Sequence, residues 1–212
     1  VGVIEVGPGI GSLTEQLALY AKRVVAFEID QRLLPILDET LASYDNIDIV
    51  HADILKVNLE ETVERFFSDC SQVHLVANLP YYITTPILMH VLQTSSEIER
   101  ITVMLQREVA ERMAAHPNTK EYGSLSIAVQ YYTNAEIVMD VPKTVFIPQP
   151  NVISSVLTLH RREEPPVQVL DEPFFFKIIQ ASFAHRRKTI RNNLLSYFKQ
   201  TMTKENVIQS LQ

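Results

Sequence analysis

The first half of the chain alternates short apolar runs with stretches in which leucines recur at helical spacing. Between two of the runs, Leu33, Leu37 and Leu41 are four residues apart, as on one face of a helix. The apolar runs, each of strand length, cover residues 3–6, 24–27, 47–50, 73–77 and 101–105. Such alternation is typical of a parallel sheet with helices on both faces. The sequence therefore predicts an α/β fold with a mostly parallel sheet.

The pattern changes after about Arg107. Residues 138–141 and 152–159 are β-rich and are separated by prolines, which predicts an antiparallel edge to the sheet. Residues 161–166 are charged and proline-rich, as in a linker. From Pro173 onward the signal is helical. We therefore expect two domains, a sheet domain over residues 1–164 and a small helical domain over residues 165–212.

Composition limits the class of protein and its surroundings. A length of 212 residues with 46% hydrophobic and 21% charged residues is typical of a soluble globular protein with one full-sized core. No apolar run is long enough to span a membrane, so no membrane partner is expected. The single cysteine, Cys70, excludes an internal disulfide and fits a reducing compartment, which predicts a cytoplasmic location. The net charge of −6 argues against a coat of nucleic acid but leaves room for a local basic patch.

A glycine-rich turn follows the first predicted strand and precedes a helix. Gly7, Gly9 and Gly11 let the backbone turn tightly and approach a ligand closely. Their spacing, G-x-G-x-G, departs from the G-x-G-x-x-G of dinucleotide-binding loops. We expect Ser12 to cap the helix with Glu15 as its capping-box partner, and the Glu15 carboxylate would oppose a bound phosphate. A ligand with a nucleoside but no phosphate fits better, and S-adenosylmethionine is such a ligand.

The next two predicted strands end beside carboxylates. Glu28 lies about twenty residues beyond the glycine-rich turn, where an acid binds ribose hydroxyls in nucleotide-binding sheets. Asp53 follows the third strand, and its carboxylate can accept a hydrogen bond from an adenine amine. Ile29 and Ile54 would flank the purine. Since ligands bind at the carboxyl ends of parallel strands, these residues predict a nucleoside pocket. The alternative is that each acid only caps a helix N-terminus.

The fourth predicted strand runs directly into the tetrapeptide Asn78-Leu79-Pro80-Tyr81. The side-chain oxygen of Asn78 and the backbone carbonyl of Leu79 can accept the two N–H bonds of an aromatic amine and so localise its lone pair for attack on a sulfonium methyl group. Pro80 restricts Leu79 to an extended conformation, and Tyr81 can stack on the base. This chemistry needs positioning and electrostatics but no metal. The alternative is a proline-terminated strand with a packed tyrosine.

One dense basic cluster occurs near the C-terminal end. We expect Phe183, Ile190 and Leu194 to face a helical core while the basic side chains face outward together. On an acidic protein such a cluster is a good candidate for contacts to nucleic-acid phosphates, with Arg107 and Arg112 adding to it. The alternative is an ordinary solvated helix face. The cluster consists of His185, Arg186, Arg187, Lys188 and Arg191.

Together these motifs resemble the ribosomal RNA adenine N6,N6-dimethyltransferases, a family that includes the macrolide-resistance methylases. The sequence from Asn78 to Pro86 and that from Phe183 to Leu194 resemble the housekeeping branch, which acts on the small subunit, more than the resistance branch. The resemblance covers most of the chain in order, through residues 5–11, 27–30, 53–55, 78–88, 104–113, 121–128, 145–152 and 181–194.

The resemblance implies a class I Rossmann-like methyltransferase that uses S-adenosylmethionine and no metal. It implies that Gly7, Glu28, Asp53 and Asn78 contact the methyl donor or the target amine, and that Phe146 lies across the target base from Tyr81. The implied substrate is a pair of adjacent adenosines near the 3′ end of 16S ribosomal RNA in an assembling small subunit. We expect the protein to be a monomer.

Family members normally carry an N-terminal Gln-Asn-Phe-Leu segment that closes over the methyl donor. This sequence begins within a strand pattern and ends within a helical pattern. We therefore expect it to be the central part of a longer protein, with an incomplete helical domain.

Two other interpretations remain open from the residues. The first is a non-catalytic RNA-binding or ribosome-assembly factor that retains the fold, which the intact Asn78 and Tyr81 disfavour. The second is a nicotinamide-dependent oxidoreductase, which the glycine spacing disfavours.

Overall fold

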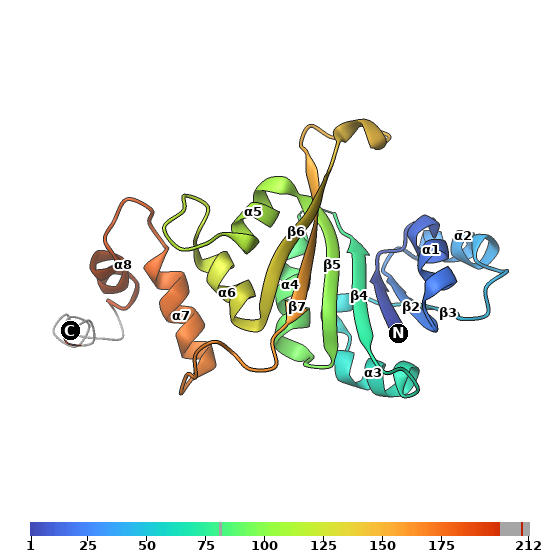
Figure 1. Ribbon diagram of the computed structural model, residues 1–212, viewed down its shortest axis with the longest axis horizontal. Coiled ribbons are helices and arrows are strands. Elements are labelled where there is room, and N and C mark those ends of the chain that lie inside the picture. Colours follow the sequence, from blue (N-terminus) through green and yellow to red (C-terminus); the bar gives the residue numbers. More distant parts are fainter. Residues whose placement is uncertain (81, 200–208, 210–212) are drawn as a thin grey trace.

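The computed structural model describes residues 1–80, 82–199 and 209, and it contains a seven-stranded sheet with the order β3-β2-β1-β4-β5-β7-β6 (Figure 1). The strands are β1 (Gly2–Val6), β2 (Arg23–Glu28), β3 (Ile47–His51), β4 (Val73–Asn78), β5 (Ile98–Gln106), β6 (Thr133–Val141) and β7 (Ser154–Arg161). Neighbours among β1 to β5 pair in parallel, and β7 pairs antiparallel with both β5 and β6. The predicted α/β fold and its antiparallel edge are confirmed.

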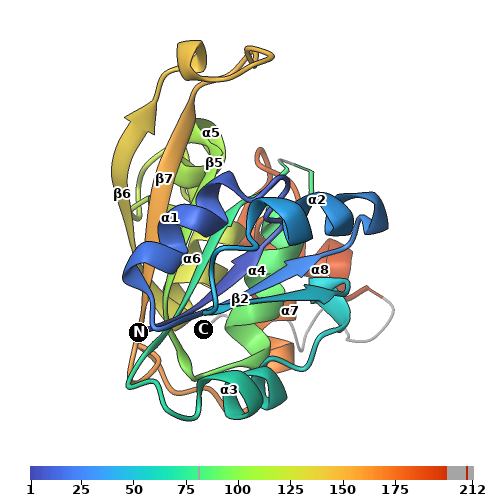
Figure 2. The same cartoon turned by 90° about the vertical axis from the view of Figure 1, so that its right-hand side faces the viewer.

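Helices cover both faces of this sheet (Figure 2). They are α1 (Ser12–Tyr20), α2 (Leu34–Thr40), α3 (Leu59–Phe67), α4 (Thr84–Thr94), α5 (Arg107–Ala114), α6 (Ser124–Tyr132), α7 (Glu172–Ser182) and α8 (Ile190–Tyr197). Helix α1 packs on the face of Val3 and Val24, whereas α3 to α6 build the main core on the face of Ile4 and Leu75. No helix in the part of the chain that the structure describes is long and apolar enough to cross a membrane.

Strand β1 is buried along its whole length because it lies between β2 and β4. Its Ile4 side chain is fully buried, and burial of such a side chain contributes about 1.5–3 kcal/mol. At Gly2 a Cβ atom would lie 2.2 Å from Cδ1 of Phe67 in α3. A glycine at this position therefore lets α3 pack directly against the start of the central strand.

The start of α1 differs from the prediction. The N-cap is Gly11, whose φ of 93° is left-handed, and Ser12 is already helical, so the expected capping box of Ser12 and Glu15 is wrong. The buried face of α1 is small, consisting of Thr14 and Ala18. Small side chains on this face let α1 lie close to the sheet.

The end of β7 also differs from the prediction, because Arg161 belongs to the strand and not to a linker. Its guanidinium donates hydrogen bonds to the carbonyls of Leu92 (3.2 Å), Val91 (3.4 Å), Ser95 and Ile98 (3.1 Å). Three of these carbonyls belong to the last turn and the C-cap of α4, where the helix dipole favours a positive charge. Burial lowers the pKa of Arg161. This side chain therefore caps α4 and ties it to the antiparallel edge.

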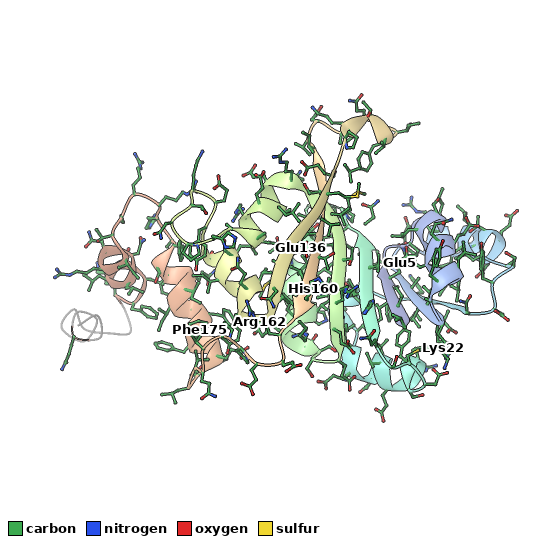
Figure 3. The ribbon with its side chains drawn as sticks, viewed as in Figure 1. Glu5, Lys22, Glu136, His160, Arg162 and Phe175 are labelled. Atoms are coloured by element: carbon green, nitrogen blue, oxygen red, sulfur yellow. The ribbon has the colours of Figure 1, made fainter. Side chains whose placement is uncertain are left out.

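Helices α7 and α8 pack on each other through Ala181, Leu194 and Phe198. Helix α7 also packs on α6 through the rings of Tyr131, Tyr132, Phe175 and Phe176, with Phe175 labelled on α7 in Figure 3. The hydroxyls of Tyr131 and Tyr132 donate to the carboxylate of Glu172, at 3.4 Å for Tyr131. Burial and the Glu172 carboxylate raise the pKa of Tyr132. The C-terminal helices are thus attached to the sheet domain by rings and hydroxyls together.

We expect Arg161→Met to lower the free energy of unfolding by about 2–3 kcal/mol, because it leaves buried carbonyls at the end of α4 without a donor. Urea unfolding measures the loss. The control is Lys177→Met on the exposed side of α7, which we expect to change stability by less than about 0.5 kcal/mol. Equal losses for the two variants would contradict the capping role of Arg161.

Candidate active site

The carboxyl ends of the strands surround a pocket of about 480 Å³. Its walls come from the residues that follow β1, β2, β3 and β4. The predicted site residues on these walls are Gly7, Gly9, Glu28, Ile29, Asp53, Ile54, Asn78, Leu79 and Pro80. Segments far apart in the sequence are thus brought together at one edge of the sheet.

The glycines of the loop after β1 have different roles. Gly7 and Gly9 have left-handed φ values of 68° and 60°, and a Cβ atom on either would meet no atom within 4 Å. A side chain there would occupy open space beside the pocket and would strain the backbone. At Gly11, which does not line the pocket, a Cβ atom would lie 3.2 Å from Cδ2 of Leu41. Gly11 therefore packs the loop against α2, and its expected contact with a ligand stays a prediction.

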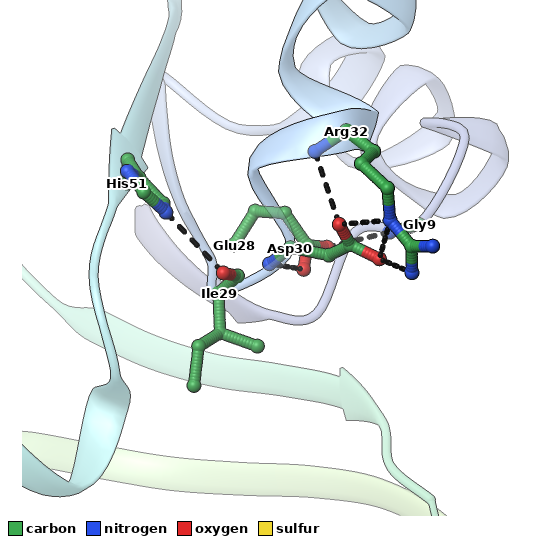
Figure 4. A network of polar contacts seen from close by, with 6 residues as sticks. All are labelled: Gly9, Glu28, Ile29, Asp30, Arg32 and His51. Carbon is green, nitrogen blue, oxygen red and sulfur yellow. Dashed lines mark hydrogen bonds and ion pairs between the residues drawn. The ribbon is translucent and has the colours of Figure 1, made fainter.

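Glu28 is the last residue of β2 and is almost fully buried. Its Oε1 accepts a hydrogen bond from the backbone N–H of Asp30 at 2.8 Å, and its Oε2 accepts one from the N–H of Gly9 at 3.4 Å (Figure 4). The carboxylate therefore connects the glycine loop to the end of β2. Each oxygen keeps acceptor capacity for a ligand hydroxyl.

Asp53 both caps a helical turn and lines the pocket. Its Oδ1 accepts a hydrogen bond from the N–H of Leu55 at 3.1 Å, which begins the short turn η2 (Ile54–Lys56). Its Oδ2 lies 4.0 Å from Nζ of Lys56 and accepts no hydrogen bond from any residue within the described part of the chain. The capping interpretation is therefore correct for one oxygen, while the other keeps acceptor capacity for a ligand beside the Lys56 ammonium.

The residues after β4 present two acceptors in a fixed turn. Asn78 is the exposed last residue of β4, and its side chain has no hydrogen-bond partner among residues 1–80, 82–199 and 209. The carbonyl of Leu79 likewise accepts no hydrogen bond from the backbone of these residues. The carbonyl of Pro80 accepts from the N–H of Ile83 and from Oγ1 of Thr84, both at 3.1 Å. The turn is thereby attached to the first turn of α4.

Tyr82, Ile83 and Ile87, which follow the tetrapeptide, are among the pocket-lining residues that we did not predict. The side chain of Tyr82 is 84% exposed. The spacing of Ile83 and Ile87, four residues apart after the tetrapeptide, is the sequence signal that would have identified them. Tyr81, the predicted stacking residue, lies outside the described residues.

Phe146 lies at the tip that connects β6 to β7 and does not line the pocket. Gln106, at the carboxyl end of β5, pairs with Ser154, which also pairs with Val141. Residues 142–153 therefore extend from the same edge of the sheet as the pocket (Figure 1). The expected placement of Phe146 opposite Tyr81 stays a prediction.

The basic cluster does not lie on one helix face as predicted. Helix α7 ends at Ser182 and α8 begins after its N-cap Thr189, so Arg186, Arg187 and Lys188 lie in the connection between the helices and only Arg191 lies in α8. The Nδ2 atom of Asn193 donates to the carbonyls of Ser182 (2.8 Å) and His185 (3.1 Å), which holds this connection in a non-helical path.

The flanking apolar residues of the cluster are also placed differently from the prediction. Leu194 is buried, but Ile190 is 54% exposed. Arg107 is paired with Glu111 at 2.8 Å and with Asp140 at 3.2 Å, so it adds no uncompensated charge to the cluster.

Glu5 is a buried carboxyl in β1, two residues before the glycine loop. Its side chain is 1% exposed, and its Oε2 has no hydrogen-bond partner in the described part of the chain. Burial raises the pKa of Glu5 to about 7, an effect that the Thr14 hydroxyl partly opposes. The group therefore titrates near neutral pH beneath the pocket loop.

The profile of the family described as "Ribosomal RNA adenine dimethylase" matches residues 1–211. "Ribosomal RNA small subunit methyltransferase A" of Oceanobacillus iheyensis is 59% identical over 209 residues, which are 99% of this chain and 71% of the relative. The protein of the same name from Bacillus licheniformis is 61% identical over 195 residues, 92% of this chain and 67% of the relative.

Two solved structures are similar over nearly the whole chain. A dimethyladenosine transferase from Plasmodium falciparum has a TM-score of 0.75 at 26% identity and covers 99% of this chain and 70% of that one. The 23S rRNA methyltransferase ErmE has a TM-score of 0.72 at 28% identity and covers 100% of this chain and 80% of that one.

We expect Glu5→Gln to remove a pH dependence of stability. With a folded pKa of about 7 against 4.5 for the free side chain, the folded state keeps a proton that the unfolded state releases, so the wild-type free energy of unfolding falls as pH rises from about 4.5 to 7. The free energy of unfolding of the glutamine variant, relative to that of the wild type, should therefore rise by about 3 kcal/mol as pH rises through this window.

Urea unfolding at a series of pH values measures this difference. The exposed Glu136→Gln serves as the control and should retain the wild-type profile. A profile of Glu5→Gln parallel to that of wild type would show that Glu5 titrates in its ordinary range.

Proposed function

Because this chain belongs to the ribosomal RNA adenine dimethylase family, we propose that it transfers methyl groups from S-adenosylmethionine to the N6 atoms of adenosines in small-subunit ribosomal RNA. The observation that carries the proposal is the turn after β4, where Asn78 and the carbonyl of Leu79 present acceptors that receive no hydrogen bond from the described residues, beside a pocket with the chemistry of a nucleoside site.

The pocket residues fit S-adenosylmethionine. Glu28 has acceptor capacity for the ribose hydroxyls, and the Oδ2 of Asp53 can accept from the adenine amine, with Ile29 and Ile54 as apolar walls. The open space beside Gly7 and Gly9 lets the backbone approach the ligand. When bound, S-adenosylmethionine supplies an electrophilic methyl group on a sulfonium.

The residues after β4 prepare the target nitrogen. The N6 lone pair of adenine is delocalised into the ring, which makes the amine a poor nucleophile. We infer that Asn78 and the Leu79 carbonyl accept the two N6–H bonds and draw the nitrogen towards tetrahedral geometry. A nitrogen–carbon bond forms as the sulfur–carbon bond breaks, and the resulting ammonium loses its proton to solvent. The Pro80 carbonyl accepts a hydrogen bond from the Thr84 hydroxyl, which fixes the turn. The Asn78 and Leu79 acceptors are therefore in place before the substrate arrives.

Dimethylation needs room for one methyl group on the attacking nitrogen. Leu79, Ile83 and Ile87 give the pocket an apolar wall near Asn78. A methylated N6 has lost one N–H donor, so one of the two acceptors loses its partner, while the apolar wall gives the new methyl group an apolar surface to contact. This lining supports two successive transfers in one site.

We infer that the targets are two adjacent adenosines near the 3′ end of 16S ribosomal RNA in an assembling small subunit, and that a monomer acts in the cytoplasm. Residues 1–164 would form the methyltransferase domain and residues 165–212 part of an RNA-binding domain. The exposed Arg187, Lys188 and Arg191 support the RNA-binding role.

We expect Glu28→Gln to weaken binding of the methyl-donor product S-adenosylhomocysteine about tenfold to a hundredfold, since charge-assisted hydrogen bonds contribute about 1.5–3 kcal/mol. Calorimetry measures the affinity, with Glu136→Gln on the exposed face of β6 as the matched control. Tighter binding of NAD than of S-adenosylhomocysteine by the wild type would instead favour an oxidoreductase.

We expect Asn78→Ala to lower kcat about 10²–10³-fold while donor binding is largely kept, because it removes an acceptor that acts on the reacting nitrogen. Radiolabelled methyl transfer to unmethylated small subunits measures this. Asn134→Ala, an exposed asparagine on β6, is the matched control. Substantial activity of Asn78→Ala would refute the acceptor role, and subunit binding by an inactive wild type would favour a non-catalytic assembly factor.

A further inference from the structure

The connection between α5 and α6, residues 115–123, lies against the basic connection between α7 and α8. The Nη2 atom of Arg186 donates a hydrogen bond to the backbone carbonyl of Lys120 at 2.9 Å. The rings of Tyr122 and Phe183 meet edge to face with their centroids 6.3 Å apart. Two segments that are far apart in the sequence therefore form one continuous surface, on the side of the molecule where the C-terminal helices lie (Figure 1).

The α5–α6 connection has a defined shape. Both the N–H and the hydroxyl of Thr119 donate to the carbonyl of His116, at 3.3 and 2.7 Å, and Asn118 adopts a left-handed φ of 70°. The N–H of Gly123 donates to Oγ of Ser126 at 3.0 Å. A turn tied at both ends and braced by Arg186 holds the Lys120 backbone in one place.

The charges on this surface are uncompensated. Lys120, Arg187, Lys188 and Arg191 are all exposed, and no acid in the described ranges forms an ion pair with any of them. Glu121 is the single acid in residues 115–123 and 183–191. On a chain with a net charge of −6, such a concentration of cations favours a polyanionic partner.

Arg186 differs from its neighbours because its guanidinium is committed to the Lys120 carbonyl. A side chain bound to the protein's own backbone is less available for a phosphate. In Lys120 the backbone carbonyl accepts the Arg186 hydrogen bond, while the side-chain ammonium forms no ion pair with any described residue.

We propose that Lys120 is a phosphate-contacting residue of the ribosomal RNA surface and that Arg186 is a positioning residue that holds Lys120 there. This inference rests on the proposed function and extends it to a residue of the sheet domain. RNA that contacts Lys120 together with Arg187, Lys188 and Arg191 bridges the sheet domain and the C-terminal helices. Such contacts position the RNA without reading its sequence.

The test is a double-mutant cycle with Lys120→Gln, Arg186→Gln and the double variant, each made in the full-length protein. Binding to unmethylated small subunits is measured at several salt concentrations. We expect Lys120→Gln to reduce the slope of log affinity against log salt by about one. Arg186→Gln should cause a loss of similar size, and the double variant should lose no more than Arg186→Gln alone.

The matched control is Lys22→Gln, which lies at the far end of the molecule from the C-terminal helices (Figure 3) and should keep the wild-type slope. Unchanged affinity for S-adenosylhomocysteine verifies that each variant is folded. A wild-type slope for Lys120→Gln would overturn the phosphate contact, and additive losses in the double variant would overturn the positioning role. Absence of salt-dependent subunit binding by the wild type would overturn the proposed RNA substrate itself.

Discussion

The parallel register of β1 with its two neighbours determines where every group of the candidate site lies. Val6 pairs with Phe27 in β2 and with Ala77 in β4, so the next residues along the three strands, Gly7, Glu28 and Asn78, come level with one another. A shift of one residue would turn the side chains of β1 to the wrong faces of a sheet that is buried on both sides. The glycine loop, the Glu28 carboxylate and the Asn78 amide are therefore aligned by backbone pairing and core burial.

Much of this arrangement was predictable because it depends on local patterns. Strand-length apolar runs, the glycine loop and the acids at strand ends are all visible within a few residues of sequence. The roles of Gly11 and Arg161 were not, because Gly11 combines a left-handed φ with a close approach to Leu41, and Arg161 binds the end of α4. The path between α7 and α8 likewise depends on Asn193, whose hydrogen bonds to the chain before it compete with helix continuation. Such contacts join residues that no periodicity relates.

The arginines show why a count of basic residues says little about nucleic-acid binding. Arg161 caps a helix, Arg162 donates to the carbonyls of Gln130 and Thr133, and Arg107 is neutralised by two acids. Arg186 braces a neighbouring loop. These four side chains hold elements of the fold together. The charges available to a polyanion are those of cations without an acidic or carbonyl partner in the described residues, such as Arg187, Lys188 and Arg191.

Helix α4 is fastened at both ends. Thr84 and Ile83 bind the Pro80 carbonyl at its start, and Arg161 binds the carbonyls at its end. The helix thus connects the antiparallel edge of the sheet to the turn that follows Asn78. The position of Asn78 is therefore set by the whole sheet and not by a loop alone. A segment outside this frame, such as the β6–β7 tip, can therefore move or change in sequence without displacing the Asn78 side chain.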